Sequence, residues 1–230
     1  MKFPDEAAKE EQGSRLSEYI LGGQDGLVNV MGLVLGVASA TNDSRIVIIS
    51  GLAGLAAESI SMAAVAYTST RAAQDFYESE IKREKGHIKT RKIAEKRFLK
   101  HLYERKGFRG RLLRQIIAKI TGNKKIWVDE IVKEEIGPAD NVNHPIRSGI
   151  IVGIATLIGS IIPLIPFFFL PVGTSILVAL GMGLLVLFGV GFAKSKLTIG
   201  NPWKNGLEMA VIGTLAAVVG YFIGLALGAS

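Results

Sequence analysis

Apolar residues are gathered into five long runs, which short polar segments and one long charged segment separate. The runs cover residues 26–41, 46–67, 149–170, 172–193 and 207–228. The last four are each close to the roughly 20 residues that a helix needs to cross about 30 Å of hydrocarbon. A transmembrane β-barrel would show short segments of alternating hydrophobicity, and these runs do not alternate. We therefore predict an all-α, polytopic membrane protein with five transmembrane helices.

The charged segment between the second and third runs predicts a small helical insert. Residues 71–105 contain few helix breakers, so we expect them to extend the second transmembrane helix. Apolar residues at helical spacing predict a second helix over 111–120, and a third over 126–136 ends before Gly137-Pro138. The chain then divides into an N-terminal part with the first two spans, the insert, and a part with the last three spans: residues 1–70, 71–147 and 148–230.

Charge is unevenly distributed along the chain and predicts its orientation. Residues 71–147 hold 20 of the 27 Lys and Arg and 11 acidic residues, a net charge of +9, whereas the whole chain carries +7. By the positive-inside rule the insert and the N-terminus are cytoplasmic. Orientation and contact with anionic lipid headgroups explain the basic insert, so we expect membrane lipid and no nucleic acid as a partner.

Composition removes several classes of chemistry. The mean hydropathy of +0.35 is above the range of most soluble domains, and the chain has no cysteine for thiolate metal sites or disulfides. It has no HExxH motif, and its three histidines, His87, His101 and His144, all lie in the insert. We expect a protein that is not an enzyme and that has no permanently bound cofactor.

A few polar residues lie within the predicted spans. Asp25 opens the first run, and Asn29 follows one turn later on the same helical face. Glu58 lies near the middle of the second run, with Ser61 and Met62 one turn further along. Because charged groups at membrane depth are costly, such residues usually face a bundle interior or a water-filled path. We therefore interpret these five residues as the lining of an ion path.

The chemistry of this set favours a divalent transition metal. Carboxylate oxygens suit hard divalent cations, and the thioether of Met62 adds a preference for softer metals such as Fe²⁺. A protonatable carboxylate at mid-span also allows metal movement to be coupled to protons. Each residue has a structural alternative: Asp25 could cap the first helix, Met62 could serve packing alone, and Glu58 could form a structural pair or stay protonated.

Four segments resemble, in the same order, segments of the vacuolar iron transporter family. Residues 25–37 resemble the first span of that family, and residues 58–63 resemble its second span with a characteristic Ser-Met pair. The proline-bearing segment 162–167 is similar to the end of the third span, and 206–213 to the start of the fifth. The resemblance implies a homodimer whose first spans meet to form a path, along which Fe²⁺ or Mn²⁺ leaves the cytoplasm in exchange for protons. It places the pore aspartate at Asp25 and the pore methionine at Met62.

The resemblance also implies that the insert gathers metal through glutamates and a methionine pair. Ile131 and Val132 stand where the paired methionines are expected. His87 and Phe98 stand where two further glutamates are expected, although histidine is itself a good ligand for transition metals. A reduced metal site is therefore the hypothesis for the insert, and a solvated charged face is its alternative. The remaining candidate ligands are the glutamates that match the family pattern: Glu80, Glu84, Glu95 and Glu135.

The predicted function is thus transport of Fe²⁺ or Mn²⁺ out of the cytoplasm, with proton antiport, for metal homeostasis. The alternative is a non-transporting membrane scaffold or metal sensor that keeps the fold of a transporter. The sequence predicts a multi-pass protein of the plasma membrane in a prokaryote, or of a vacuolar or other internal membrane in a eukaryote.

Overall fold

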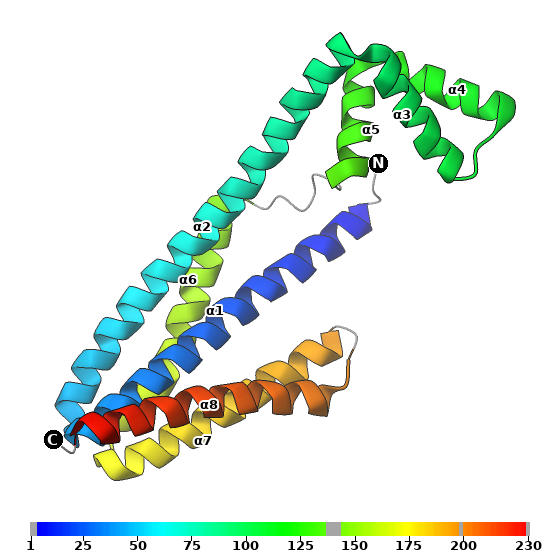
Figure 1. The fold of residues 1–230 in the computed structure, drawn as a ribbon. Coiled ribbons are helices and arrows are strands. Elements are labelled where there is room, and N and C mark those ends of the chain that lie inside the picture. The colour runs from blue at the N-terminus through cyan, green and yellow to red at the C-terminus, as the bar shows by residue number, and fades with distance from the viewer. Residues whose placement is uncertain (1–3, 137–143, 198–199, 229–230) are drawn as a thin grey trace. The chain divides into compact units, whose positions relative to one another are not determined.

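A computed structural model describes residues 4–136, 144–197 and 200–228 of the chain (Figure 1). The described residues form helices and turns and contain no strand, which confirms the predicted all-α class. Five helical segments are long and apolar enough to cross a membrane, in agreement with the five predicted spans. They cover Gln12–Thr41, Ser44–Thr90, Pro145–Phe168, Val172–Ser195 and Pro202–Gly228.

The chain divides into two compact units. Residues 1–67 and 145–230 form the first, here called the membrane unit, and residues 68–144 form the second, here called the insert unit. Helix α2 (Ser44–Thr90) begins in the membrane unit and ends in the insert unit. The other helices of the membrane unit are α1 (Pro4–Thr41), α6 (Pro145–Ile161), the short 3₁₀ helix η2 (Ile162–Phe168), α7 (Val172–Leu197) and α8 (Pro202–Gly228).

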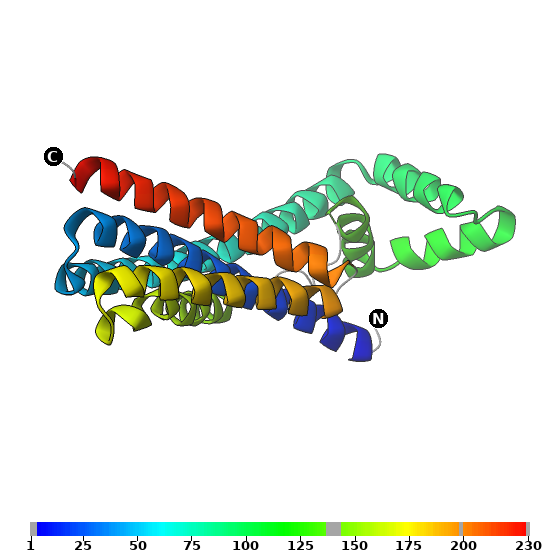
Figure 2. The same cartoon turned by 90° about the horizontal axis from the view of Figure 1, so that it is seen from below.

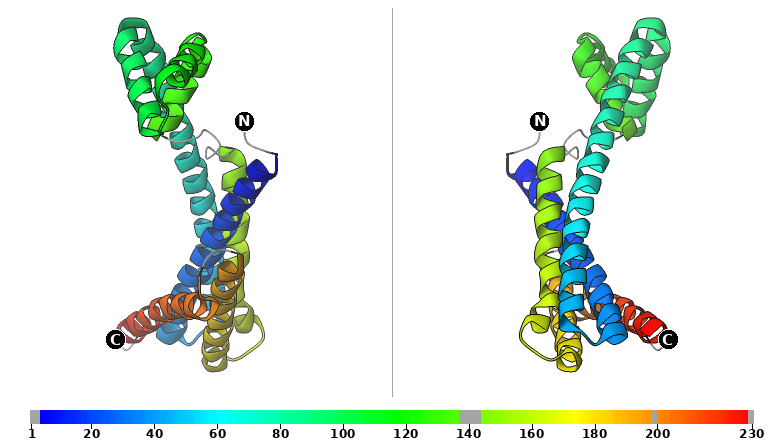
Figure 3. Two further views of the ribbon diagram at one scale, coloured as in Figure 1. Left: turned by 90° about the vertical axis from the view of Figure 1, so that its right-hand side faces the viewer. Right: turned by 90° about the vertical axis from the view of Figure 1, so that its left-hand side faces the viewer.

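Helix α1 lies at the centre of the membrane unit. Its buried apolar residues recur every three or four positions, as one continuous helical face requires: Leu27, Val30, Met31, Val34, Leu35 and Ala38. It packs closely against α6 and α8, as the two views of Figure 3 show for α6, while α7 and α8 run side by side (Figure 2). Asp25 and Asn29 lie beside the apolar face of α1 and remain available to α2.

Glycines allow α1 to approach its neighbours at backbone distance. Gly32 and Gly36 of α1 lie against Gly220 and Gly224 of α8, and a Cβ atom on Gly220 would collide with the carbonyl oxygen of Gly32. On its other side α1 meets Gly159 of α6 in the same way. Helices in lipid gain little from hydrophobic burial against one another, so such close van der Waals contact is their main source of packing energy.

The insert unit is a small bundle of the end of α2 with α3 (Lys92–Arg105), α4 (Gly110–Thr121) and α5 (Lys124–Ile136). Leu99, Trp127 and Ile131 are almost completely buried at its core. The chain turns between α3 and α4 through Gly107 and Gly110, whose positive φ angles of 94° and 59° suit glycine. The structure thus has helices over the expected ranges 111–120 and 126–136.

The expected extension of the second transmembrane helix over 71–105 is confirmed as far as Thr90 and is wrong beyond it. Helix α2 ends at Thr90 and α3 begins at Lys92, because Arg91 has φ −126° and ψ 34°, outside the helical region. The break lets α3 turn so that Leu99 reaches the apolar core formed with Leu113 and Ile117 of α4. Burial of apolar surface therefore outweighs the local preference for one uninterrupted helix.

Candidate functional site

Three polar side chains meet between α1 and α2 in the membrane unit. The side-chain amide nitrogen Nδ2 of Asn29 donates a hydrogen bond of 2.8 Å to Oε1 of Glu58. Asp25, one turn earlier on α1, lies close enough to Glu58 and Asn29 for its side chain to interact with both. We call these three residues the membrane cluster. Two acids and one amide thus lie together within two helices that are apolar enough to cross a membrane.

The position of Asp25 within α1 decides one of the structural alternatives. A helix-capping residue lies at the first turn, where backbone N–H groups lack partners. Helix α1 begins at Pro4, so Asp25 lies far inside it and has no unpaired N–H group to cap. The idea that Asp25 caps the first helix is therefore wrong, and its carboxyl group instead joins Glu58 and Asn29.

Met62 belongs to the same level of the membrane unit by helix register. The Asn29–Glu58 hydrogen bond and the packing of Leu33 on Gly54 set an antiparallel register in which residue numbers on α1 and α2 add up to 87. Met62 then lies at the level of Asp25. Its side chain is half-buried, whereas Ser61 is exposed. The structure thus brings Asp25, Asn29 and Glu58 into contact and leaves Met62 near them without a direct bond.

A small pocket opens beside Asp25 on α1. It has a volume of about 200 Å³ and is lined by four residues of α1 and one of α8: Leu21, Gln24, Asp25, Val28 and Ile212. Gln24 is a polar lining residue that sequence reasoning missed. Gln24 could have been found from the sequence, because it is a second polar residue next to Asp25 in a largely apolar stretch.

The insert unit holds a second candidate site, which we call the insert cluster. It consists of Glu84, His87 and Glu95, each with one ligand atom within 4.8 Å of the others. Nδ1 of His87 lies 3.5 Å from Oε2 of Glu84 and 3.9 Å from Oε1 of Glu95. Glu84 and His87 come from α2 and Glu95 from α3, so the helix break at Arg91 creates the site. One imidazole and two carboxylates suit a first-row divalent metal.

Glu84 is the residue of this cluster that most needs a positive partner. It is only 3% exposed, and its Oε1 atom is buried without a hydrogen-bond partner. Burial, followed by the nearby charge of Glu95, raises the pKa of Glu84 above its ordinary value. A bound cation would remove both of these unfavourable effects, because it would pair with the buried carboxylate and balance the charge of Glu95.

Arg83 keeps two other predicted ligands away from the insert cluster. Its guanidinium forms ion pairs with Glu80 on α2 and with Glu135 on α5, the second at 3.7 Å. Both glutamates are thereby neutralised by a residue of the protein itself. Of the five residues proposed as ligands in the insert, the structure brings three together and pairs two with Arg83. Sequence reasoning noted that basic residues are frequent here but did not single out Arg83.

Ile131 and Val132 take no part in either site. They are 0% and 1% exposed and lie in the apolar core of the insert unit beside Trp127. Methionines at these two positions could bind metal only if their sulfur atoms extended out of the core or if the core were repacked. The residues present offer no ligand atom, so the insert cluster contains only oxygen and nitrogen ligands.

The fold and these two clusters define a multi-span helical membrane protein with a candidate cation path and a separate candidate metal site. Comparison with known proteins identifies the family: the VIT family profile matches residues 16–225, so the chain belongs to the VIT family. Vacuolar iron transporter 1 of Eucalyptus grandis is 29% identical over 91% of this chain and 85% of its own length. The vacuolar iron transporter of Toxoplasma gondii is 31% identical over 94% of this chain and 76% of its own.

Protein CCC1 of Saccharomyces cerevisiae is also similar, at 29% identity over 93% of this chain and 69% of its own length. These matches confirm the resemblance that the four sequence segments indicated. The family is one of transporters and not of enzymes, which confirms the expectation for this chain.

Proposed function

We propose that this chain carries Fe²⁺ or Mn²⁺ out of the cytoplasm across the membrane, in exchange for protons. The observation that carries the proposal is the membrane cluster: Asp25, Asn29 and Glu58 meet between two helices that are apolar enough to cross a membrane. The family relationship supports a metal as substrate, because the relatives are named as iron transporters. A purely structural role is a weak account of two acids in contact at this depth.

Proton exchange follows from the chemistry of the same cluster. Two carboxyl groups that lie close together repel each other when both are ionised, so a proton on one of them stabilises the pair. A divalent cation bound by Asp25 and Glu58 would displace that proton, and its departure would allow a proton to return. Met62, at the same level of α2, would supply a soft ligand that favours Fe²⁺ over Mg²⁺.

The assembly and orientation are part of the proposal. The pocket beside Asp25 and the exposed side chain of Asn29 lie on the surface of the chain, so a second copy is needed to enclose a path there. We therefore propose a homodimer in which α1 of each copy contributes its Asp25. The basic insert supports a cytoplasmic location of residues 71–147 and of the N-terminus. The names of the relatives support a vacuolar or other internal membrane.

The insert cluster is proposed to collect metal on the cytoplasmic side. Glu84, His87 and Glu95 provide ligand atoms close enough for one ion, and the buried Oε1 of Glu84 lacks any other partner. Because Glu80 and Glu135 pair with Arg83, we propose a single ion at this site.

A flux assay tests the proposal. The purified full-length protein is reconstituted into liposomes with an imposed pH gradient, and entry of Fe²⁺, Mn²⁺, Co²⁺ and Zn²⁺ is recorded with a metal-quenched dye. We expect Fe²⁺ or Mn²⁺ entry that needs the pH gradient and stops when a protonophore collapses it. Metal entry that ignores the gradient would contradict proton exchange, and no entry of any metal would contradict transport.

A second function, a membrane-bound metal sensor or scaffold, is favoured by one observation. The insert keeps only three clustered ligands, and the positions of the methionine pair hold buried aliphatic residues. A sensor would bind metal at the insert cluster and show no flux in liposomes. Metal binding that disappears in a Glu84→Gln variant, together with no flux by the unaltered protein, would favour the sensor over the transporter.

A further inference from the structure

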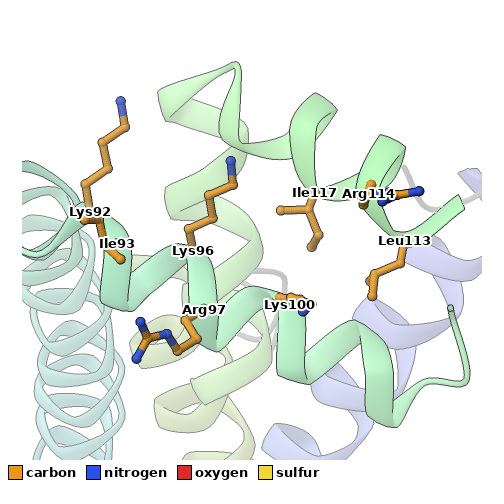
Figure 4. A pocket seen from close by; sticks show the side chains of 8 residues that line it. All are labelled: Lys92, Ile93, Lys96, Arg97, Lys100, Leu113, Arg114 and Ile117. Carbon is orange, nitrogen blue, oxygen red and sulfur yellow. The ribbon is translucent and has the colours of Figure 1, made fainter. Parts of the chain in front are cut away.

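A basic pocket lies between α3 and α4 of the insert unit, separate from the insert cluster. It has a volume of about 660 Å³. Five of its eight lining residues are cationic and none is acidic: Lys92, Lys96, Arg97, Lys100 and Arg114. Lys92 and Lys96 point the same way from α3, one helical turn apart (Figure 4). Like charges at this spacing repel each other, so the helix alone gains nothing from the arrangement.

The cations of this pocket have almost no partners within the protein. Lys100 lies 3.6 Å from Glu104, but Lys92, Lys96, Arg97 and Arg114 form no ion pair with any described residue. Arg83 of the same unit differs from them, because it forms ion pairs with two glutamates. Four unpaired cations around one pocket produce a local positive potential that attracts an anionic group.

The remaining wall of the pocket is apolar. Leu113 and Ile117 of α4 point toward α3 (Figure 4) and line the pocket from the core of the insert unit, with exposed fractions of only 4% and 5%, whereas Ile93 stands at the edge with 77% of its surface exposed. A small, fully hydrated anion would gain no binding energy from contact with apolar side chains. Cationic side chains above an apolar wall instead match a ligand with a charged head and a hydrocarbon part, because each part then meets a surface of its own kind.

We propose that this pocket binds an acidic phospholipid, with the headgroup phosphate and carboxylate held by Lys92, Lys96 and Arg114 and the upper acyl chain resting on the exposed Ile93 at the edge. The membrane attachment of the chain favours lipid over a soluble phosphate compound. The insert unit is joined at both ends to membrane-spanning helices, α2 and α6, so lipid is always present at high local concentration. Anionic leaflets also attract basic segments close to them.

A single fluorescent label makes the site measurable. The chain has no cysteine, so an Ala118→Cys variant can be labelled at one exposed position of α4, next to Ile117, with an environment-sensitive dye. Full-length labelled protein in a neutral detergent is titrated with dioctanoyl phosphatidylserine. The pocket variant carries Lys92→Gln, Lys96→Gln and Arg114→Gln. The matched control carries Lys124→Gln, Lys125→Gln and Lys133→Gln, which remove the same charge from exposed positions of α5 outside the pocket.

We expect saturable binding of phosphatidylserine, weakened at least about tenfold in the pocket variant and less than about twofold in the control. Exchanging Lys92 and Lys96 for Arg, and Arg114 for Lys, should retain binding, and thermal unfolding checks that each variant is folded. Equal weakening in pocket variant and control would overturn the proposal, because binding would then follow net charge alone.

Three competitors separate the possible sources of the anion. Dioctanoyl phosphatidylcholine should not displace phosphatidylserine, and inorganic phosphate or a short RNA should displace it only at far higher concentration. Displacement by inorganic phosphate at the same concentration as lipid would overturn the lipid assignment in favour of a phosphate site. Displacement by RNA at low concentration would overturn it in favour of nucleic acid.

Discussion

The membrane cluster and the insert cluster both bring acids together, but their surroundings differ. In the membrane unit, Asp25 and Glu58 have only Asn29 between them, and neither forms an ion pair with a described basic residue. In the insert unit, Arg83 lies one position from Glu84 and neutralises two nearby glutamates. A pair of acids within lipid must be balanced by a proton or a metal ion, whereas acids in the insert can be balanced by the protein's own cations.

This difference means that the membrane cluster should respond to loss of one acid more strongly than the insert cluster. An Asp25→Asn change removes a negative charge, keeps the size of the side chain and replaces one acceptor oxygen by an N–H donor. We expect metal flux to fall to the level of liposomes without protein, a loss of more than about tenfold or about 1.4 kcal/mol. Glu208→Gln is the matched control, since Glu208 is an exposed acid of α8 outside the cluster, and it should keep full flux. Normal flux in the Asp25 variant would remove Asp25 from the path.

The next largest effect is expected at Glu84, because its buried Oε1 atom has no hydrogen-bond partner and is therefore available to a metal ion. Glu84→Gln should weaken metal binding to the full-length protein by about 10- to 100-fold, measured by calorimetry with Mn²⁺. Glu78→Gln, at an exposed position six residues earlier on α2, should change it little. Equal affinities in the two variants would show that the insert cluster does not bind metal.

Metal binding to the insert should weaken on acidification. The pKa of Glu84 is raised by burial and by Glu95, so protons compete with metal for this carboxylate at a higher pH than for an ordinary glutamate, and affinity falls as pH drops through that raised pKa. Glutamine mimics the protonated carboxyl group. The loss of metal affinity that protonation of Glu84 causes therefore cannot exceed the loss caused by Glu84→Gln. The affinity should therefore vary with pH more steeply in the unaltered protein than in the variant. Parallel pH profiles would contradict the role given to Glu84.

The raised pKa of Glu84 also affects the stability of the insert unit when no metal is bound. A group with a raised pKa in the folded state adds stability below its ordinary pKa of 4.5, and that contribution is lost as pH rises through the folded value. Metal should accordingly stabilise the insert unit more at neutral pH than at acidic pH. Fluorescence of the buried Trp127 during thermal unfolding would report this difference.

The smallest change in metal affinity is expected for substitution of Arg83. This side chain is about half exposed and would influence the bound metal only through its charge and through the two glutamates that it pairs with. Arg83→Gln would release Glu80 and Glu135 and reduce positive charge near the cluster. We expect Mn²⁺ affinity to rise by about two- to fivefold, within the range of an exposed ion pair. Lys82→Gln, an exposed cation one residue earlier, is the control for charge alone. Unchanged affinity in the Arg83 variant would show that Glu80 and Glu135 are too far from the ion to help.

The membrane unit was more predictable from sequence than the insert unit. Polar residues are so rare among the apolar runs that Asp25, Asn29 and Glu58 stand out without any knowledge of neighbours. Three residues at matching helical positions on two adjacent spans then come together in the fold. The sequence did not show that helix α1 starts near Pro4, because its first turns are polar and carry no apolar periodicity.

In the insert unit charged residues are common, so composition could not separate ligands from solvated residues. Glu80, Glu84 and His87 share a helical face, yet Glu80 pairs with Arg83 and only the other two meet Glu95. The insert cluster depends on the helix break at Arg91. This break is stabilised by the packing of Leu99 in the core, and the local sequence around Arg91 does not predict it. The basic pocket depends on the same break, because it places α3 against α4.

The membrane cluster is proposed to exchange a metal ion for protons. Simultaneous recording of Mn²⁺ entry and internal pH in liposomes, for the unaltered protein and for Glu58→Gln, tests this claim most directly. We predict that Mn²⁺ entry and proton exit rise together in the unaltered protein and that both are lost in the variant. Undiminished Mn²⁺ entry with unchanged proton exit in Glu58→Gln would contradict the account.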